Sequence, residues 1–311
     1  MLLRMSLRHI STLLTFLAML PFGIFASDTP SVDLEAALQS QYVKKVYVLR
    51  GFYDGSHLHF DRDGSPLGEV YRGPWTTSAI AIDKAKVSPK KIQLLGSRIA
   101  EVYDSKQSKF VPSRTRESVF IDIDRDATAP NSAPIAALGR IFLGLNEPLS
   151  DIVPDYWKAF VLGAVEKVPS KGETNCYRIK GRLSRMVNGG IAADCTDGAS
   201  VKPDVSANTV DEGSLPYDPS KSIEPPRAVH QPDPDFWPVA KELRVEGTTT
   251  LQLVVRTDGS TSDIQIVAPI GVGIDDEAAA AVKTWKFKPA TLNGQPVPVR
   301  IVVEVSFHLS R

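Results

Sequence analysis

The pattern of apolar and polar positions is most regular at the end of the chain, between residues 297 and 309. The odd-numbered positions of this stretch are all apolar, and most of the even-numbered positions are polar. Such alternation predicts a strand with one face buried and the other in water. Because a long strand near a chain end often lies at a sheet edge, we expect it to keep a row of unpaired backbone groups that another polypeptide can complete.

A small α+β module, residues 230–311, contains this strand. The pattern predicts a short helix at 234–243, a hairpin of two strands between 247 and 266, and a second helix that begins at Asp275 or Asp276. The second helix carries an apolar stripe for packing on the sheet: Ala278, Ala281, Val282 and Trp285.

Residues 31–200 predict a mostly antiparallel β domain with a helical insertion. It opens with a helix at 31–41 that Ser31 can cap. Turn residues separate short β-branched and aromatic runs at intervals of roughly ten residues. We expect strands at 45–52, 58–60, 79–82, 91–95, 99–103, 118–123, 176–183 and 190–195, with helices at 134–143 and 150–163.

Residues 201–229 predict a linker between the two parts. Five prolines lie among Ser, Asp and Glu, and apolar residues are rare: the prolines are Pro203, Pro216, Pro219, Pro225 and Pro226. Such a composition buries no core and favours extended polyproline geometry.

The amino end predicts export to the periplasm or cell envelope. Arg4 and Arg8 precede an apolar run from Ile10 to Ala26, as in a secretory signal. The run is also near the lower length limit for spanning a bilayer, so residues 1–26 are either a cleaved signal peptide or a retained inner-membrane anchor. In an oxidising compartment Cys176 and Cys195 are expected to form a disulfide, the alternative being two free thiols.

Charge and motifs argue against several classes of function. Lys+Arg and Asp+Glu are equal at 36 each, which gives no net field for nucleic acid. Two acidic or histidine-containing patterns lack the geometry of a metal site, and we predict no metal or cofactor there: His57, His59, Asp61 and Asp63, and then Asp122, Asp124 and Asp126. No nucleophile elbow, phosphate loop or zinc-protease motif is present, so we expect a protein that is not an enzyme.

The C-terminal module resembles the C-terminal domain of the TonB family of energy transducers. An ordered set of residues carries the resemblance, which covers about a quarter of the chain: Pro234, Phe236, Ala240, Glu246, Gly247, Asp258, Gly259, Gly273, Asp275, Ala278, Ala281, Val282, Trp285, Phe287, Pro289, Ala290, Gly294, Pro296, Val297, Glu304 and Phe307. The resemblance implies a two-helix, three-stranded antiparallel module at the end of a periplasmic arm.

In that family the last strand pairs with a short extended segment of an outer-membrane receptor, a case of β-augmentation. The resemblance therefore implies partner-binding positions on the exposed face of the last strand: Arg300, Val302, Glu304 and Ser306. A second implied contact is the aromatic-proline segment Phe236, Trp237 and Pro238. Main-chain hydrogen bonds worth about 1 kcal/mol each leave little after the cost of association, so we expect micromolar or weaker binding.

Three departures from the family bear on force transmission. His9 lies before the apolar run and not within it, a whole β domain stands between the amino end and the module, and Phe236 replaces a tyrosine. Coupling to the inner-membrane proton-driven motor complex is thus less directly implied than receptor binding. A different class remains open, in which residues 31–200 are a ligand carrier or envelope enzyme and the module is a tether.

Overall fold

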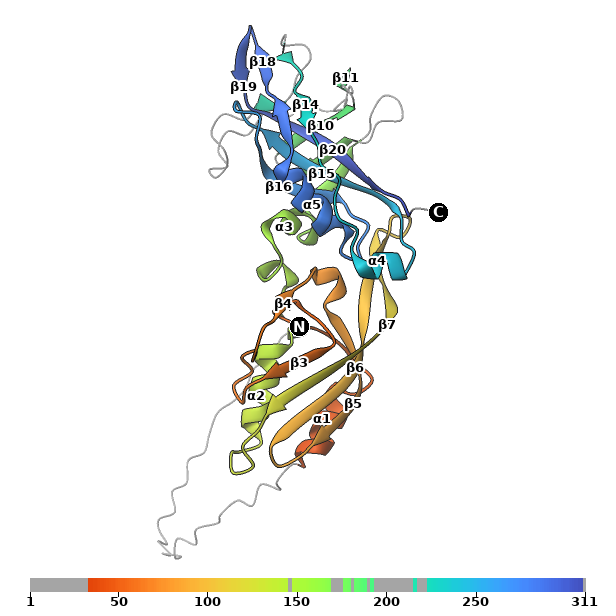
Figure 1. Ribbon diagram of the computed structural model, residues 1–311, viewed down its shortest axis with the longest axis vertical. Helices are drawn as coiled ribbons and strands as arrows, with labels where there is room; N and C mark the ends of the chain where they lie inside the picture. The colour runs from red at the N-terminus through yellow and green to blue at the C-terminus, as the bar shows by residue number, and fades with distance from the viewer. Residues whose placement is uncertain are drawn as a thin grey trace, which may run out of the picture.

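The computed structural model describes residues 33–144, 147–168, 176–179, 182–188, 191–192, 215–216 and 223–309. The predicted signal or anchor at 1–26, the Ser31 cap, Cys195 and most of the linker lie outside these residues. Figure 1 shows an elongated α+β arrangement, with the first domain at one end and the C-terminal module at the other. None of the helices in the described part of the chain combines the length and apolar character needed to cross a bilayer.

The first domain is built on a five-stranded sheet in the order β1, β5, β6, β7, β3. Its strands are β1 Val46–Val48, β5 Ala79–Val87, β6 Lys91–Asp104, β7 Lys109–Asp124 and β3 His57–Phe60. The expected separate strands at 91–95 and 99–103 are one long strand, β6, whose pairing with β7 shifts between Ser97 and Ile99. The interrupted pattern therefore marks a bulge and not a turn. β3 joins β7 in parallel, a departure from the antiparallel expectation.

Two helices help to enclose the core of this sheet. α1, Leu34–Tyr42, and α2, Ser132–Ile141, contribute Leu38 and Leu138 to a core that also contains Ile82 and Ile121. Asp33 caps α1, because its Oδ1 accepts a hydrogen bond from the Glu35 N–H at 3.0 Å. Short elements complete the domain: β2 Tyr53–Asp54, β4 Tyr71–Arg72 and the 3-10 helix η1 Trp75–Thr77.

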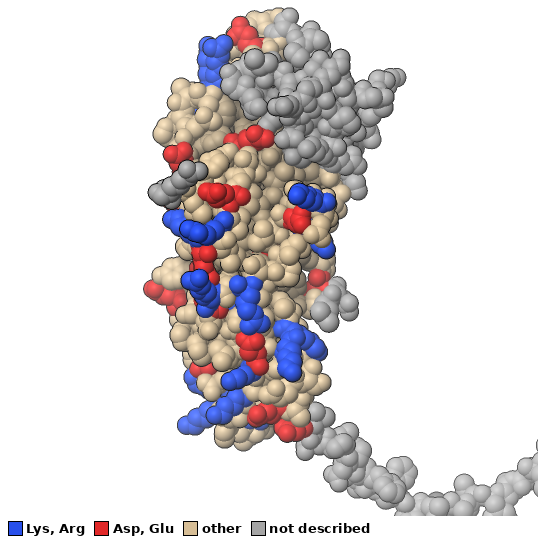
Figure 2. All heavy atoms as spheres, turned by 90° about the vertical axis from the view of Figure 1, so that its right-hand side faces the viewer, with Lys and Arg blue, Asp and Glu red and all other residues tan. Residues whose placement is uncertain are grey.

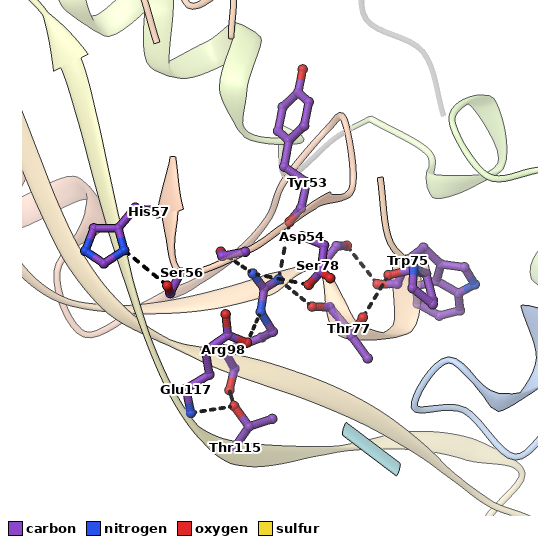
Figure 3. A network of polar contacts seen from close by, with 12 residues as sticks. Tyr53, Asp54, Ser56, His57, Trp75, Thr77, Ser78, Arg98, Thr115 and Glu117 are labelled. Carbon is purple, nitrogen blue, oxygen red and sulfur yellow. Dashed lines mark hydrogen bonds and ion pairs between the residues drawn. The ribbon is translucent and has the colours of Figure 1, made fainter. Parts of the chain in front are cut away.

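Arg98 is buried in the middle of the first domain, with only 1% of its surface exposed. Its Nε donates to Glu117 Oε2 at 2.7 Å, and its Nη1 and Nη2 donate to the carbonyls of Thr77 at 2.9 Å and Gly55 at 2.8 Å (Figure 3). The carboxylate and carbonyls compensate for burial of the charge. One side chain thus ties β6 to β7, to η1 and to the turn before β3.

The C-terminal module has the predicted helices and hairpin. β16 Thr261–Ala268, β15 Gly247–Val255 and β20 Val299–Phe307 form its antiparallel centre, and α4 Pro238–Glu242 and α5 Ile274–Thr284 contribute Ala240, Ala278 and Val282 to the core. The expected cap was wrong: α5 begins after Gly273, and neither Asp275 nor Asp276 caps it. Within the apolar stripe Ala281 is only half-buried, whereas Ala279 is buried.

Part of the predicted linker belongs to the module. β13 Ile223–Glu224 pairs with β18 Ala290–Leu292, which also pairs with β19 Gln295–Val297. β14 Arg227–His230 pairs with β17 Lys286–Lys288. Backbone pairing with these strands supplies the stability that composition alone did not indicate, so the described residues 223–230 are structured.

The module's sheet also recruits strands that the sequence pattern assigned to the first domain. β10 Arg182–Asn188 pairs with β20 and with β9 Cys176–Ile179, which pairs with β8 Val165–Val168. Two shorter pieces pair with the same sheet: β11 Ile191–Ala192 with β10, and β12 Leu215–Pro216, from the predicted linker, with β20. The β domain expected at 31–200 is therefore divided between two sheets.

A continuous contact, here called the seam, joins the first domain to the module. The Tyr103 N–H donates to the Ile270 carbonyl at 2.7 Å, and the Val272 N–H donates to the Glu101 carbonyl at 2.9 Å. The Gly273 N–H donates to Thr76 Oγ1 at 2.9 Å. In Figure 1 the β6–β7 hairpin extends from the first domain to the module, where these bonds form.

Apolar side chains close the seam. α3 Asp155–Val161, preceded by the 3-10 helix η2 Leu149–Asp151, places Trp157 in one core with Trp75 and Ala100 of the first domain and with residues of the module. The module side of this core includes Val272, Ile274, Ala278, Ala279 and Val282. The two parts thus share a hydrophobic core and are not simply tethered.

Candidate functional site

The edge of β20 is covered over part of its length. β15 pairs with β20 on one side along the whole strand, from Gly247 opposite Phe307 to Val255 opposite Val299. On the other side β12 lies beside residues 299–300, and β10 lies beside residues 301–302. The expectation of a fully free edge was therefore wrong for residues 299–302, because strands distant in the sequence occupy it.

The remaining part of the strand, residues 303–307, is here called the open half-strand. Among the described residues no strand pairs with it on the side away from β15. Glu304 and Ser306 are exposed, whereas the alternate residues point into the module's core. Ser306 Oγ lies 2.9 Å from Thr248 Oγ1 on β15, and beyond the strand the Leu309 N–H donates to Glu246 Oε1 at 2.5 Å. These contacts hold the open half-strand extended.

Arg300 and Val302 do not lie on an exposed face. Arg300 is 5% exposed, and its Nη1 lies 2.7 Å from Asp263 Oδ2 on β16. Val302 is fully buried in a second small core with Val267 and Ile179. The expected exposed face was wrong at both positions: residues of α3 and β9 pack against Val302 on the second face of the sheet, and Arg300 is buried in its ion pair with Asp263.

The aromatic-proline segment divides between two surroundings. The Phe236 ring stands edge-on to Phe307 with centroids 5.6 Å apart, which places it beside the end of the open half-strand. Trp237 is half-buried in the seam, where a β-carbon added to Gly273 would lie 2.6 Å from its ring. Pro238 is exposed at the first position of α4. Phe236 thus lies beside the open half-strand, whereas Trp237, which is buried to a similar degree, lies at the seam.

Asp275 holds the loop that forms the module's side of the seam. The carboxylate is fully buried and accepts hydrogen bonds from the Ile270 and Gly271 N–H groups, at 2.9 and 2.7 Å, and from Thr249 Oγ1 at 2.7 Å. Burial raises the pKa of Asp275 to about 7, against the opposing effect of these hydrogen bonds. Its role is structural, and the spacing that suggested a helix cap did not indicate it.

Asp276, the next residue of α5, faces α3. Its Oδ1 accepts from the Tyr156 hydroxyl at 2.9 Å and from Trp157 Nε1 at 3.2 Å. Burial raises the pKa of Asp276 to about 6. Sequence reasoning missed this cluster of Asp276, Tyr156 and Trp157. The available signal was the pair of adjacent acids at the start of a helix, because a helix cap requires only one.

Charge over the molecule is mixed. On the face shown in Figure 2, Lys and Arg side chains are interspersed with Asp and Glu. Of the two patterns examined as metal sites, Asp61 turns inward to cap its own loop, accepting from the Asp63 and Ser65 N–H groups, and His59 lies 2.9 Å from Asp124. Across the described ranges no three His, Cys, Asp or Glu residues are grouped to hold a metal ion.

Comparisons with known proteins concern the C-terminal module. Residues 232–309 match the family model described as Gram-negative bacterial TonB protein C-terminal. The protein TonB of Vibrio cholerae is 31% identical over 80 residues, which are 25% of this chain and 33% of that protein. The protein tonB2 of Pseudomonas aeruginosa is 32% identical over 83 residues, 26% of this chain and 31% of that one.

A solution NMR structure of the Pseudomonas aeruginosa TonB CTD matches with 21% identity and a TM-score of 0.24, covering 28% of this chain and 88% of that chain. The chain spans about a third of the length of the two curated relatives. The resemblance of the C-terminal module to TonB, inferred from its residues, is confirmed by the family match. The predicted partner-binding residues stay predictions.

Proposed function

We propose that this is an exported, TonB-like envelope protein whose C-terminal module binds an extended segment of an outer-membrane receptor by strand pairing. The observation that carries the proposal is the open half-strand at 303–307, in a module that matches the TonB C-terminal family. An extended segment laid along it would continue the sheet from β20 outward. The proposal includes export directed by residues 1–26. Energy transduction for transmembrane transport would be a further step that depends on this binding.

The partner-binding residues that the structure supports are fewer than the sequence suggested. Glu304 and Ser306 project from the open half-strand into solvent, and the Phe236 ring stands beside its end. Every second residue of a strand presents its N–H and C=O to the same side, so about half of residues 303–307 can bond to a partner. A few bonds of about 1 kcal/mol each favour binding in the micromolar range or weaker.

Paired proline variants at neighbouring positions test the proposal. Glu304→Pro and Val305→Pro remove backbone N–H groups that point to opposite sides of β20. The variant whose N–H pointed to β15 loses a bond within the sheet, and a lower melting temperature identifies it. The other variant loses a donor on the open side of β20. We expect this open-side variant to stay folded and to lose binding of peptides from the amino-terminal segments of outer-membrane receptors, measured by calorimetry or NMR titration.

The control is Leu162→Ala, a substitution at an exposed position outside β20. Unchanged peptide binding by both proline variants, with the fold verified by circular dichroism, would end the strand-pairing proposal. Sequencing of the mature amino terminus tests the export step, since an end near Ser27 indicates a cleaved signal and an intact Met1 in the membrane fraction indicates an anchor.

A further inference from the structure

A cleft of about 490 Å³ lies at the seam, between the first domain, α3 and the module. Trp75 and Arg72 line it from the first domain, Tyr156 lines it from α3, and Trp237, Asp276 and Glu277 line it from the module. Ile152, Val153 and Pro154 supply an apolar wall. The cleft therefore combines aromatic faces with two carboxylates from one turn of α5.

Two buried polar atoms on the lining residues have no hydrogen-bond partner in the described part of the chain. Asp276 uses Oδ1 for Tyr156 and Trp157, while its Oδ2 is buried without a partner. The indole N–H of Trp75 is likewise buried without a partner, and Trp75 is only 7% exposed. Such atoms are rare in folded proteins, because each loses its water without a replacement. Both atoms belong to residues that line the same cleft, so a ligand in that cleft is the nearest group that can complete them once their side chains turn toward it.

The charge of the cleft selects the kind of ligand. Glu277 lies beside Asp276, and the pKa of Glu277 is raised by burial and by the neighbouring charges of Asp235 and Asp276. The only basic side chain on the lining, Arg72, is exposed. A cation inside the cleft would offset the acidic charge, and the aromatic residues Tyr156 and Trp237, whose rings attract cations, line the same cleft.

We propose that this cleft binds an organic cation, an alkylammonium or alkylguanidinium group, beside the carboxylates of Asp276 and Glu277, with a turn of the Asp276 side chain bringing Oδ2 to the N–H of the ligand. Its alkyl stem would lie against the apolar wall, and a carbonyl carried by the same ligand would accept from Trp75 Nε1. The cation comes either from a free small molecule or from a Lys or Arg side chain of a peptide. The site lies at the seam, away from the open half-strand, and does not depend on strand pairing.

Calorimetric titration of the full chain with n-butylguanidinium tests the proposal, with n-butylurea as the neutral probe of the same shape. We expect saturable binding of the cation, and at least about tenfold weaker binding of the urea, because a hydrogen bond to a charged group is stronger than a neutral one. Asp276→Asn keeps an oxygen for Tyr156 and Trp157 but loses the charge, and we expect it to weaken binding about 10- to 100-fold. Glu304→Gln makes the same charge change on the open half-strand and is expected to bind the cation like the parent.

A third titration with the peptide acetyl-Gly-Arg-Gly-amide identifies the source. Tighter binding of the peptide than of n-butylguanidinium indicates a protein side chain, and the reverse indicates a small molecule. Should Asp276→Asn unfold, Glu277→Gln replaces it, since Glu277 is only half-buried. The absence of saturable binding, equal binding of cation and urea, or unchanged binding in the folded variants overturns the proposal. None of these outcomes alters the proline test at 304 and 305, so the two proposals fail separately.

Discussion

Replacing Trp157 by alanine tests whether the first domain and the module form one cooperative unit. Trp157 is fully buried, and its ring stands edge-on to Trp75 at 5.3 Å and close to Phe110 at 6.2 Å. Its Nε1 also donates to Asp276. A buried tryptophan removes up to about 200 Å² from water, which at about 25 cal/mol per Å² corresponds to an upper limit of about 5 kcal/mol.

We therefore expect Trp157→Ala to lower the free energy of unfolding by about 3–5 kcal/mol, in the range of other large-to-small core substitutions. Trp157→Phe keeps much of the packing and loses the bond to Asp276, for a loss of about 1–2 kcal/mol. Leu162→Ala is the matched control directly after the end of α3, since Leu162 is 63% exposed. Its effect should stay within about 0.5 kcal/mol.

Urea denaturation followed by circular dichroism gives these energies, and hydrogen exchange detected by mass spectrometry locates the loss. Because Trp157 contacts both sides of the seam, Trp157→Ala should speed exchange in β6 of the first domain and in α5 of the module together. Faster exchange confined to α3, with β6 and α5 protected as in the parent, would refute the shared core. So would a loss of stability no larger than that of Leu162→Ala.

Three further predictions concern buried charges. Asp275→Ala removes the acceptor of the Ile270 and Gly271 N–H groups and of the Thr249 hydroxyl. Thermal unfolding should show that the free energy of unfolding falls by about 3–5 kcal/mol. A variant as stable as the parent would contradict the structural role of Asp275. The pKa values of about 7 for Asp275 and about 6 for Asp276 lie above the ordinary 3.8, so the folded state binds more protons in this window. The contribution of these groups to stability is greatest at low pH and is lost as pH rises from about 4 to about 7. Urea denaturation across this range should show a decline in the free energy of unfolding that is shallower in Asp276→Asn than in the parent. An identical decline in that variant would count against a raised pKa at Asp276. Arg98→Met leaves Glu117 and three backbone carbonyls without their donor and should cost about 3–5 kcal/mol in urea denaturation, more than Glu117→Gln, and equal effects would argue against the network.

The local pattern predicted elements well and their neighbours poorly. The alternation along β20 correctly indicated a strand whose odd positions face a core, because that signal depends only on the strand itself. It did not show that Arg300 and Val302 are buried too, because their partners come from other elements: residues of α3 and β9 pack on Val302, and Asp263 of β16 pairs with Arg300. Burial on the second face of a sheet is a tertiary property that a period of two cannot express.

The same reasoning explains the domain boundary. Strands were predicted at 176–183 and 190–195, but a strand pattern does not state which sheet the strand will join, and β8 was not predicted at all. Likewise the sequence predicted a helix at 150–163, and only the structure shows that Trp157 of this helix joins the module's core. The cleft was not predicted, since its walls come from three separate parts of the chain.

The close approach at Gly271 has a consequence for grafting experiments. A β-carbon there would lie 2.0 Å from the Glu101 carbonyl oxygen, so β6 tolerates no side chain at this point. A C-terminal module transplanted from another protein would collide with the hairpin unless it brought a glycine to the same place. Chimeras without a glycine at this position should keep the fold of the module but pack in a different orientation on the β6–β7 hairpin, or detach from it. Gly271 therefore determines which modules can be exchanged on this first domain.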